Sequence, residues 1–207
     1  HGGAVLAPGV TFEFAFLRRA KLNQAGKRAI GRMAASLVSD GQSVLLDSGT
    51  TTVAIAEHLR TRLDIKVITT SLPIASMLQY SETVELNLLG GQLRPGSPDL
   101  YGAMTESNLD MICPDIAFVG AAAVDAKGSV FTESATLSRL LAKMAKCAKR
   151  AYIVADSSKL GKTALWRYGD LRQLAGLITD GLAEATLIDS LTRRGVTVLQ
   201  PKPSSRK

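Results

Sequence analysis

Short apolar runs alternate with segments of helical periodicity along most of this 207-residue chain. Apolar runs of about 4–8 residues are typical of strands buried on both faces, and helices between such strands make neighbouring strands run parallel. The runs that predict strands are residues 43–46, 66–70, 84–89, 116–119, 151–155, 176–179 and 196–199. The sequence therefore predicts an α/β fold, a mostly parallel sheet with helices on both faces.

Between these runs, apolar residues recur with the spacing of one helix face. Helices are predicted over 29–37, over 53–59, from 71 onward, within 100–111, over 135–150 and over 182–194. Residues 1–20 show no clear period and are interpreted as a linker or arm. Residues 201–207 are interpreted as a polar, disordered tail.

A small polar turn, Asp47-Ser48-Gly49-Thr50-Thr51-Thr52, joins the strand 43–46 to the following helix. Glycine permits a sharp turn and the close approach of a ligand. A helix N-terminus presents free N–H groups and the positive end of the helix dipole, and four hydroxyl groups add donors. The turn is therefore a candidate site for a phosphate or carboxylate. The alternative is that Ser48 or Thr50 only caps the helix.

Several other polar or glycine-containing segments also follow predicted strands. In open α/β sheets, ligands bind beyond the carboxyl ends of the strands. The segments at these ends are 47–52, 69–71, 90–91, 120 and 156–159. Because parallel strands bring them to one edge of the sheet, their convergence favours the anion site over a simple helix cap.

Other kinds of site find no support in the sequence. Cys113 and Cys147 have neither metal-ligand spacing nor a disulfide framework, and both are interpreted as core thiols. The GKT sequence at 161–163 lacks the first glycine of a Walker A loop, because Asp156 stands there, and no G-x-G-x-x-G follows a strand. We therefore expect no metal and no cofactor.

No apolar run reaches the length of a membrane span and no signal peptide is evident, so a cytoplasmic location is expected.

The net charge of +7 raises the question of DNA binding. The basic residues are scattered, and the densest group, 143–150, lies at the end of a predicted helix, where cations complement the dipole. No aromatic platform accompanies it. A solvated helix end is the preferred interpretation.

Five blocks of the sequence resemble DeoR-type bacterial transcriptional regulators in their order and spacing. The blocks are LLDSGTTT at 45–52, VITTSLPIA at 67–75, LLGG at 88–91, DIAFVGAAAVDAKG at 115–128 and VADSSKLG at 154–161. The opening HGGA is similar to the sequence that follows the N-terminal winged helix-turn-helix of that family. The resemblance extends over nearly the whole chain, which begins with His1 and so is expected to be a fragment or a processed chain.

The resemblance implies that residues 21–200 form an effector-sensing domain and that residues 1–20 follow a winged helix-turn-helix absent from this chain. The implied partners are a phosphorylated sugar or related metabolite, operator DNA bound through that N-terminal domain, and further copies of the chain in a dimer or tetramer. Effector binding is expected to weaken operator affinity, as in a repressor. The implied fold is similar to ribose-5-phosphate isomerase.

That fold likeness supplies the alternative function, a sugar-phosphate isomerase-like enzyme. The isomerase carries a D-G-A-D-E block whose carboxylates transfer protons. Aligned on Gly120, this chain has Val119, Ala122 and Ala123 at the carboxylate positions. Without a base within reach, enediol chemistry has no proton acceptor, so the sensor is favoured.

Candidate roles can be given to three further residues, Lys159 among them because it follows a strand end by a few residues. Thr70 stands where these regulators usually have asparagine, so a hydroxyl replaces an amide. Glu133 is a candidate for binding a ligand hydroxyl, or else a plain helix-start carboxylate. Lys159 is expected to pair with the phosphate or a sugar oxygen rather than to be a surface lysine. The full set of candidate ligand-binding residues is Asp47, Ser48, Gly49, Thr50, Thr51, Thr52, Thr70, Ser71, Gly90, Gly91, Gly120, Glu133 and Lys159.

Overall fold

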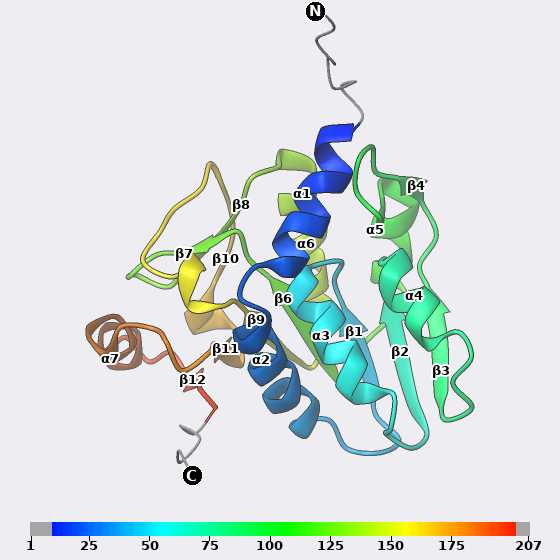
Figure 1. The fold of residues 1–207 in the computed structure, drawn as a ribbon, viewed down its shortest axis with the longest axis horizontal. Coiled ribbons are helices and arrows are strands. Elements are labelled where there is room, and N and C mark those ends of the chain that lie inside the picture. Colours follow the sequence, from blue (N-terminus) through cyan, green and yellow to red (C-terminus); the bar gives the residue numbers. More distant parts are fainter. Residues whose placement is uncertain (1–9, 202–207) are drawn as a thin grey trace, which may run out of the picture.

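A seven-stranded sheet forms the centre of the computed structural model, which describes residues 10–201, with side chains from residue 16 onward. The strand order is β12-β11-β9-β6-β1-β2-β3, and every pairing is parallel (Figure 1). The strands are β1 Ser43–Leu46, β2 Ile65–Thr69, β3 Val84–Leu88, β6 Ile116–Gly120, β9 Arg150–Val154, β11 Gly176–Ile178 and β12 Val198–Leu199. The predicted α/β class and parallel sheet are confirmed.

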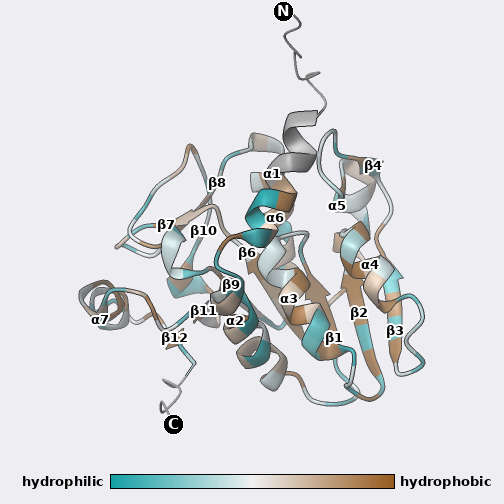
Figure 2. Cartoon of the chain, viewed as in Figure 1, coloured by the Kyte–Doolittle hydropathy of each residue, from teal (hydrophilic) through white to brown (hydrophobic). Residues whose placement is uncertain are grey.

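Helices cover both faces of this sheet. They are α1 Val10–Lys21, α2 Gln24–Ser36, α3 Thr50–Leu59, α4 Leu72–Leu78, α5 Ala103–Asp110, α6 Ala135–Cys147 and α7 Ala185–Arg193, with the 3-10 helices η1 Ser157–Lys159 and η2 Leu171–Gln173. One core cluster joins α2, α3 and α4 to the sheet and includes Ile30 and Ile55; the other joins α5, α6 and α7 and includes Leu109 and Met144. The central strands are almost wholly hydrophobic (Figure 2) because both of their faces are buried.

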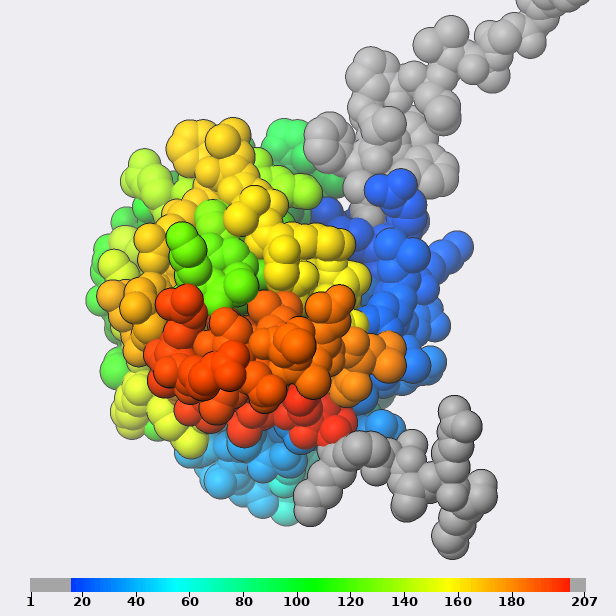
Figure 3. Space-filling view, turned by 90° about the vertical axis from the view of Figure 1, so that its left-hand side faces the viewer, coloured from blue at the N-terminus to red at the C-terminus, as the bar shows by residue number. Residues whose placement is uncertain are grey.

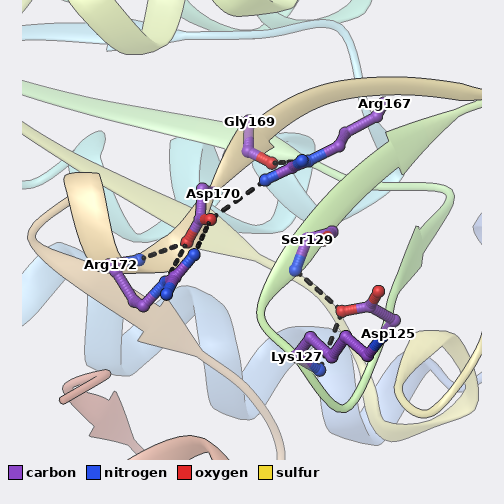
Figure 4. Close-up of polar contacts among 7 residues, drawn as sticks. All are labelled: Asp125, Lys127, Ser129, Arg167, Gly169, Asp170 and Arg172. Atoms are coloured by element: carbon purple, nitrogen blue, oxygen red, sulfur yellow. Dashed lines mark hydrogen bonds and ion pairs between the residues drawn. The ribbon is translucent and has the colours of Figure 1, made fainter. Parts of the chain in front are cut away.

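Two small antiparallel sheets were not predicted from the sequence. One has the order β10-β8-β7, with β7 Ala123–Val124, β8 Ser129–Thr132 and β10 Trp166–Asp170; the other pairs β4 Gln92–Leu93 with β5 Leu100–Tyr101. Asp125 shapes the β7–β8 turn by accepting hydrogen bonds from the backbone N–H groups of Lys127 and Ser129, at 2.9 and 2.8 Å (Figure 4). β7 has only two residues and the other four strands are partly exposed, so they lack the apolar run that marks a doubly buried strand.

The segment predicted as a linker or arm contains a helix, and one of the predicted core thiols is exposed. Residues 10–21, which show no clear period, form helix α1, while residues 1–9 and 202–207 lie outside the described part of the chain. The expectation for Cys113 was wrong, since its side chain is exposed in the loop before β6; Cys147 is half-buried at the end of α6. Burial raises the pKa of the Cys147 thiol to about 11.

Candidate functional site

The order of the strands creates a topological switch point between β1 and β6. From β1 the chain proceeds to β2 and β3 on one side, and it later returns to place β6 on the other side. The loops that follow β1 and β6 therefore leave in opposite directions, and the crevice between them is the place where ligands bind in such sheets. The predicted anion loop follows β1, and Gly120 ends β6.

Asp47 ties these two loops together. Its Oδ1 accepts hydrogen bonds from the backbone N–H of Gly49, at 2.7 Å, and from the hydroxyl of Thr52, at 2.9 Å. Its Oδ2 accepts a 2.6 Å hydrogen bond from the backbone N–H of Gly120. Burial raises the pKa of Asp47, and the hydrogen bonds from Gly49 and Gly120 offset part of that effect. With its oxygens committed in this way, Asp47 organises the site more than it offers an acceptor to a ligand.

Gly120 is held from two sides. Its N–H donates to Asp47, and its carbonyl oxygen accepts a hydrogen bond from the buried hydroxyl of Tyr168 on β10. Burial raises the pKa of Tyr168 well above its usual value, so this hydroxyl remains a donor. The small sheet thus fixes one wall of the switch point.

No side chain caps the N-terminus of α3. Its N-cap residue is Gly49, and no side-chain cap hydrogen bond is present. The hydroxyl of Ser48 donates instead to Asp99, at 3.0 Å, and the hydroxyl of Thr52 donates to Asp47. The alternative that Ser48 or Thr50 only caps the helix is therefore wrong, and the first N–H groups of α3 stay available to a ligand.

A cavity of about 430 Å³ opens at this point, and we call it the switch-point cavity. Its walls come from residues 19–27 at the α1–α2 junction, 47–51, 94–97, 120–122, 132–141 and 154–159. The segment around residue 158 (yellow) and the α1–α2 segment (blue) lie side by side on one surface of the molecule (Figure 3). A larger cavity, about 750 Å³, lies where β9 begins, at the other end of the sheet, and contains none of the predicted site residues.

Cations outnumber carboxylates around the switch-point cavity. The cations are Arg19, Lys27, Arg94 and Lys159, and the carboxylates are Asp47, Glu133 and Asp156. Asp156 lies directly after β9, and its Oδ1 accepts hydrogen bonds from the N–H and hydroxyl of Ser158, at 3.1 and 2.5 Å. Because Arg94 is also paired with the buried Asp99, the charges balance, and it is the helix N-terminus and the N–H donors of these cations that suit an anionic ligand.

Lys27 is buried in one wall of this cavity. Its Nζ donates to the carbonyl oxygens of Arg19 and Leu22, the latter at 2.7 Å, at the C-terminal end of α1. Only 6% of the residue is exposed. Burial lowers the pKa of Lys27, and the nearby charge of Asp156 opposes that shift.

Eight of the predicted residues line the switch-point cavity: Asp47, Ser48, Gly49, Thr50, Thr51, Gly120, Glu133 and Lys159. Thr52, Thr70, Ser71, Gly90 and Gly91 are not among the described residues that line it. Thr52 is fully buried beneath the loop. Thr70 and Ser71 anchor a neighbouring loop, because the carbonyl of Thr70 accepts from the N–H of Leu100 and Ser71 pairs with Asp99 in a β-bridge.

The two glycines after β3 also have a structural explanation. The carbonyl of Gly90 accepts a 2.7 Å hydrogen bond from the hydroxyl of Thr105. Gly91 has φ +151, and a Cβ there would lie 2.1 Å from that hydroxyl oxygen and 2.6 Å from the carbonyl oxygen of Tyr101. The pair was expected to line the cavity, but neither glycine is among its described lining residues. Their lack of a side chain instead allows β4 to pack closely against β5 and α5.

The list of candidate ligand-binding residues left out several polar residues of the cavity, namely Arg19, Lys27, Arg94, Ser97, Asp156 and Ser158. Asp156 and Ser158 had a signal, since they follow a strand and stand beside Lys159. Arg94 and Lys27 had none, because one lies in a loop and the other on a helix preceding the first strand. Among the side chains described from residue 16 onward, no cluster of three His, Cys, Asp or Glu is placed to hold a metal. In the part of the chain that the structure describes, no helix is long and apolar enough to cross a membrane.

A model of the DeoR C-terminal sensor domain matches residues 22–181, which include every lining residue of the switch-point cavity except Arg19. The chain belongs to this family. The HTH-type transcriptional repressor GlcR of Bacillus subtilis (strain 168) is 36% identical over 200 residues, 96% of this chain and 76% of GlcR. The HTH-type transcriptional regulator GlpR of Haloferax volcanii is 33% identical over 199 residues, 96% of this chain and 78% of GlpR.

The fold of this DeoR sensor domain is also similar to a solved structure of ribose 5-phosphate isomerase A from Methanocaldococcus jannaschii. The two share 23% sequence identity with a TM-score of 0.49, over 67% of this chain and 55% of the isomerase chain. The resemblance to DeoR-type regulators that the five sequence blocks indicated is confirmed. The relatives are named as regulators of transcription, so the chain is a regulator's sensor domain.

Proposed function

We propose that the switch-point cavity binds a phosphorylated sugar or a related metabolite and that the chain is the effector-sensing part of a cytoplasmic transcriptional repressor. The observation that carries this proposal is the Asp47–Gly120 hydrogen bond, which fixes an uncapped helix N-terminus at the mouth of a cavity lined by cationic side chains. Backbone N–H groups and the helix dipole stabilise a phosphate at such a position.

The two sides of the cavity suit the two parts of such a ligand. Thr50 and Thr51 open α3 and offer backbone and hydroxyl donors to the phosphate. Asp156, Glu133 and Lys159 line the cavity as well, and these side chains provide acceptors and a donor for sugar hydroxyl groups.

Regulation follows from coupling this site to operator DNA. In the proposed full-length protein an N-terminal winged helix-turn-helix binds the operator, and the sensor domain assembles into a dimer or tetramer. Effector binding lowers operator affinity by the coupling free energy between the two sites, typically about 1–3 kcal/mol, and the operator weakens effector binding by the same factor.

An isomerase-like enzyme is the second candidate, because the carboxylate of Glu133 lines the same cavity. At the positions of the isomerase carboxylates, however, Val119 and Ala123 are buried apolar residues and Ala122 lines the cavity without a titratable group. We expect no isomer after incubation with ribose 5-phosphate or other aldose and ketose phosphates. Turnover that disappears in Glu133→Gln would favour the enzyme instead.

A thermal-shift panel of sugar phosphates and their unphosphorylated parents tests the proposal. A ligand that binds only the native state stabilises it by RT ln(1 + [L]/Kd), so a selective sugar phosphate raises the melting temperature. Calorimetry with the best ligand should then give much weaker binding for the parent sugar and for Thr51→Val, with Thr61→Val, on an exposed position, as the control. Equal affinity for a sugar and its phosphate would contradict the assignment of the anion loop.

A further inference from the structure

The loop between β4 and β5 forms one wall of the switch-point cavity, and it carries a single cation. Arg94, Gly96 and Ser97 line the cavity from this loop. Its backbone is fixed to the strand end of β2, because the N–H of Leu72 donates to the carbonyl of Pro98 at 3.0 Å. The loop is therefore held in place before any ligand arrives.

Asp99 holds Arg94 beside the anion loop. The Asp99 residue is fully buried. Its carboxylate accepts hydrogen bonds from Nε of Arg94, at 3.1 Å to each oxygen, from Nη2 of Arg94, at 2.9 Å, and from the hydroxyl of Ser48, at 3.0 Å. A buried carboxylate needs such partners. One side chain thus orients both the arginine and the first residue of the loop after Asp47.

The donors of Arg94 are only partly used. A guanidinium group has five N–H donors. The Nε donor and the two donors of Nη2 go to Asp99 and to the hydroxyl of Ser97. Among the side chains that the structure describes, from residue 16 onward, and the backbone of 10–201, Nη1 has no hydrogen-bond partner. The Arg94 side chain is 26% exposed where it lines the cavity. Two charge-assisted donors therefore remain for a ligand.

We propose that Arg94 is a ligand-binding residue that contacts the phosphate group held at the N-terminus of α3, and that Asp99 is its positioning residue. This inference rests on the proposed function and names a residue that determines selectivity for the phosphorylated ligand. Ser48 commits its hydroxyl proton to Asp99, so Ser48 contributes no hydroxyl donor to the phosphate. Arg94 supplies the cationic donors at that side.

Lysine cannot replace arginine at position 94 without losing contacts, because its side chain has fewer N–H donors. Lysine has three N–H donors on one nitrogen, whereas the loop contacts alone use three donors on two nitrogens of Arg94. A lysine would keep the charge but would have to abandon either the loop contacts or the ligand. Arg94→Lys therefore separates the proposed contact from a general electrostatic effect.

Inorganic phosphate is the probe for the test, with binding measured by calorimetry. The wild-type domain should bind it, and Arg94→Lys should bind it about ten- to a hundredfold more weakly, as for the loss of charge-assisted hydrogen bonds. The control is Arg139→Lys, because Arg139 is 78% exposed on α6 and outside the cavity. This variant should bind phosphate like the wild type.

A measurement on the wild-type protein covers the case in which the Arg94 variant does not fold. Phenylglyoxal modifies exposed guanidinium groups, and mass spectrometry reports the modified residue. Phosphate should protect Arg94 and leave the modification of Arg139 unchanged. Absence of protection would overturn the inference.

The outcomes distinguish this inference from the proposed function. If Arg94→Lys binds phosphate like the wild type while Thr51→Val binds more weakly, Arg94 is not a ligand-binding residue and the anion loop stands. If wild-type protein binds neither inorganic phosphate nor any sugar phosphate of the panel, both the inference and the proposed function are wrong.

Discussion

Asp47 accepts a 2.6 Å hydrogen bond from the backbone N–H of Gly120, a residue 73 positions further along the chain. This contact closes the crevice between β1 and β6 at its base and keeps the two loops from separating. A Cβ at Gly120 would lie 3.1 Å from Oδ2 of Asp47, so a glycine lets the strand end approach this closely. The shape of the cavity therefore depends on one carboxylate that is itself buried.

The Asp47→Asn variant should lose stability and phosphate binding together. An amide has a single acceptor oxygen, so its NH₂ group would face the N–H of either Gly49 or Gly120. Leaving a buried donor without a partner costs about 1–3 kcal/mol. Urea unfolding measures the loss, and calorimetry with inorganic phosphate measures binding.

Asp40→Asn serves as the control for Asp47→Asn, because Asp40 is an exposed residue of the turn before β1. It should change neither quantity by much. Unchanged stability in Asp47→Asn would show that the two loops hold their positions without this carboxylate.

The Gly91→Ala variant tests whether the glycines after β3 are structural. The added Cβ would collide with Thr105 and Tyr101, and its φ of +151 is unfavourable for any residue other than glycine. We expect a loss of about 3 kcal/mol from overpacking and backbone strain.

Gly90→Ala is the matched control for Gly91→Ala. Its Cβ would meet the flexible end of Met104, with Sδ at 3.3 Å, and would be in ordinary contact with Nδ2 of Asn108 at 3.8 Å, so a loss below about 1 kcal/mol is expected. Chemical denaturation gives both values. If Gly90→Ala abolishes phosphate binding while remaining stable, the original assignment of Gly90 to the ligand site was right.

The sequence predicted the buried strands of the sheet and the polar loop at the end of the first strand. Strands covered on both faces are apolar, as 43–46 and 116–119 are, and their order along the chain predicts the parallel sheet. The rule that ligands lie beyond the carboxyl ends of parallel strands favoured the polar turn at 47–52 as an anion site, and residues 47–51 line the switch-point cavity.

The sequence did not predict the parts that depend on loop geometry. Thr70 and Gly91 also follow strands, but β4 and β5 pack against those strand ends and exclude them from the cavity. Arg94 lies in a loop whose path is set by that pairing and by the buried Asp99. Lys27 contacts the end of α1 through two hydrogen bonds, and the sequence of α1 shows no clear apolar period.

Stability should fall at acidic pH because of Asp170. Hydrogen bonds from Arg172 lower the pKa of Asp170 from 3.8 to about 2, and Arg167 adds to this effect (Figure 4). Because the folded-state pKa is lowered, the contribution is fully present above the unfolded-state pKa of 3.8 and is lost as the pH falls through about 2.

The Asp170→Asn variant isolates that contribution. At pH 7 it should be less stable by about 1–2 kcal/mol, a range reduced because both arginines are half exposed to solvent. Urea unfolding from pH 2 to pH 7 should give a difference from the wild type that shrinks toward pH 2. A difference that stays constant over this range would mean that the carboxylate acts through packing and not through its charge.

The buried ammonium of Lys27 should hold the end of helix α1 against the cavity wall. It donates to the carbonyl oxygens of Arg19, in the last turn of α1, and of Leu22, directly after α1. The carbonyl of Arg19 also accepts the backbone N–H of Leu22, at 3.2 Å. Lys27→Met keeps the aliphatic length and removes these donors. Global stability should change little, because the substitution also removes the cost of burying a charge.

Hydrogen exchange gives the sharper readout for Lys27→Met. The amides near the end of α1 should exchange faster in the variant, while those of the central strands β1 and β6 should stay protected. Arg28→Met is the matched control, since Arg28 is the exposed neighbour of Lys27 on α2, and it should leave exchange in α1 unchanged.

Because Arg19 and Lys27 both line the switch-point cavity, inorganic phosphate should slow exchange at the end of α1 in the wild type more than in Lys27→Met. Equal protection of α1 in the wild type and Lys27→Met, with and without phosphate, would mean that α1 is held by its other contacts and receives no signal from the cavity.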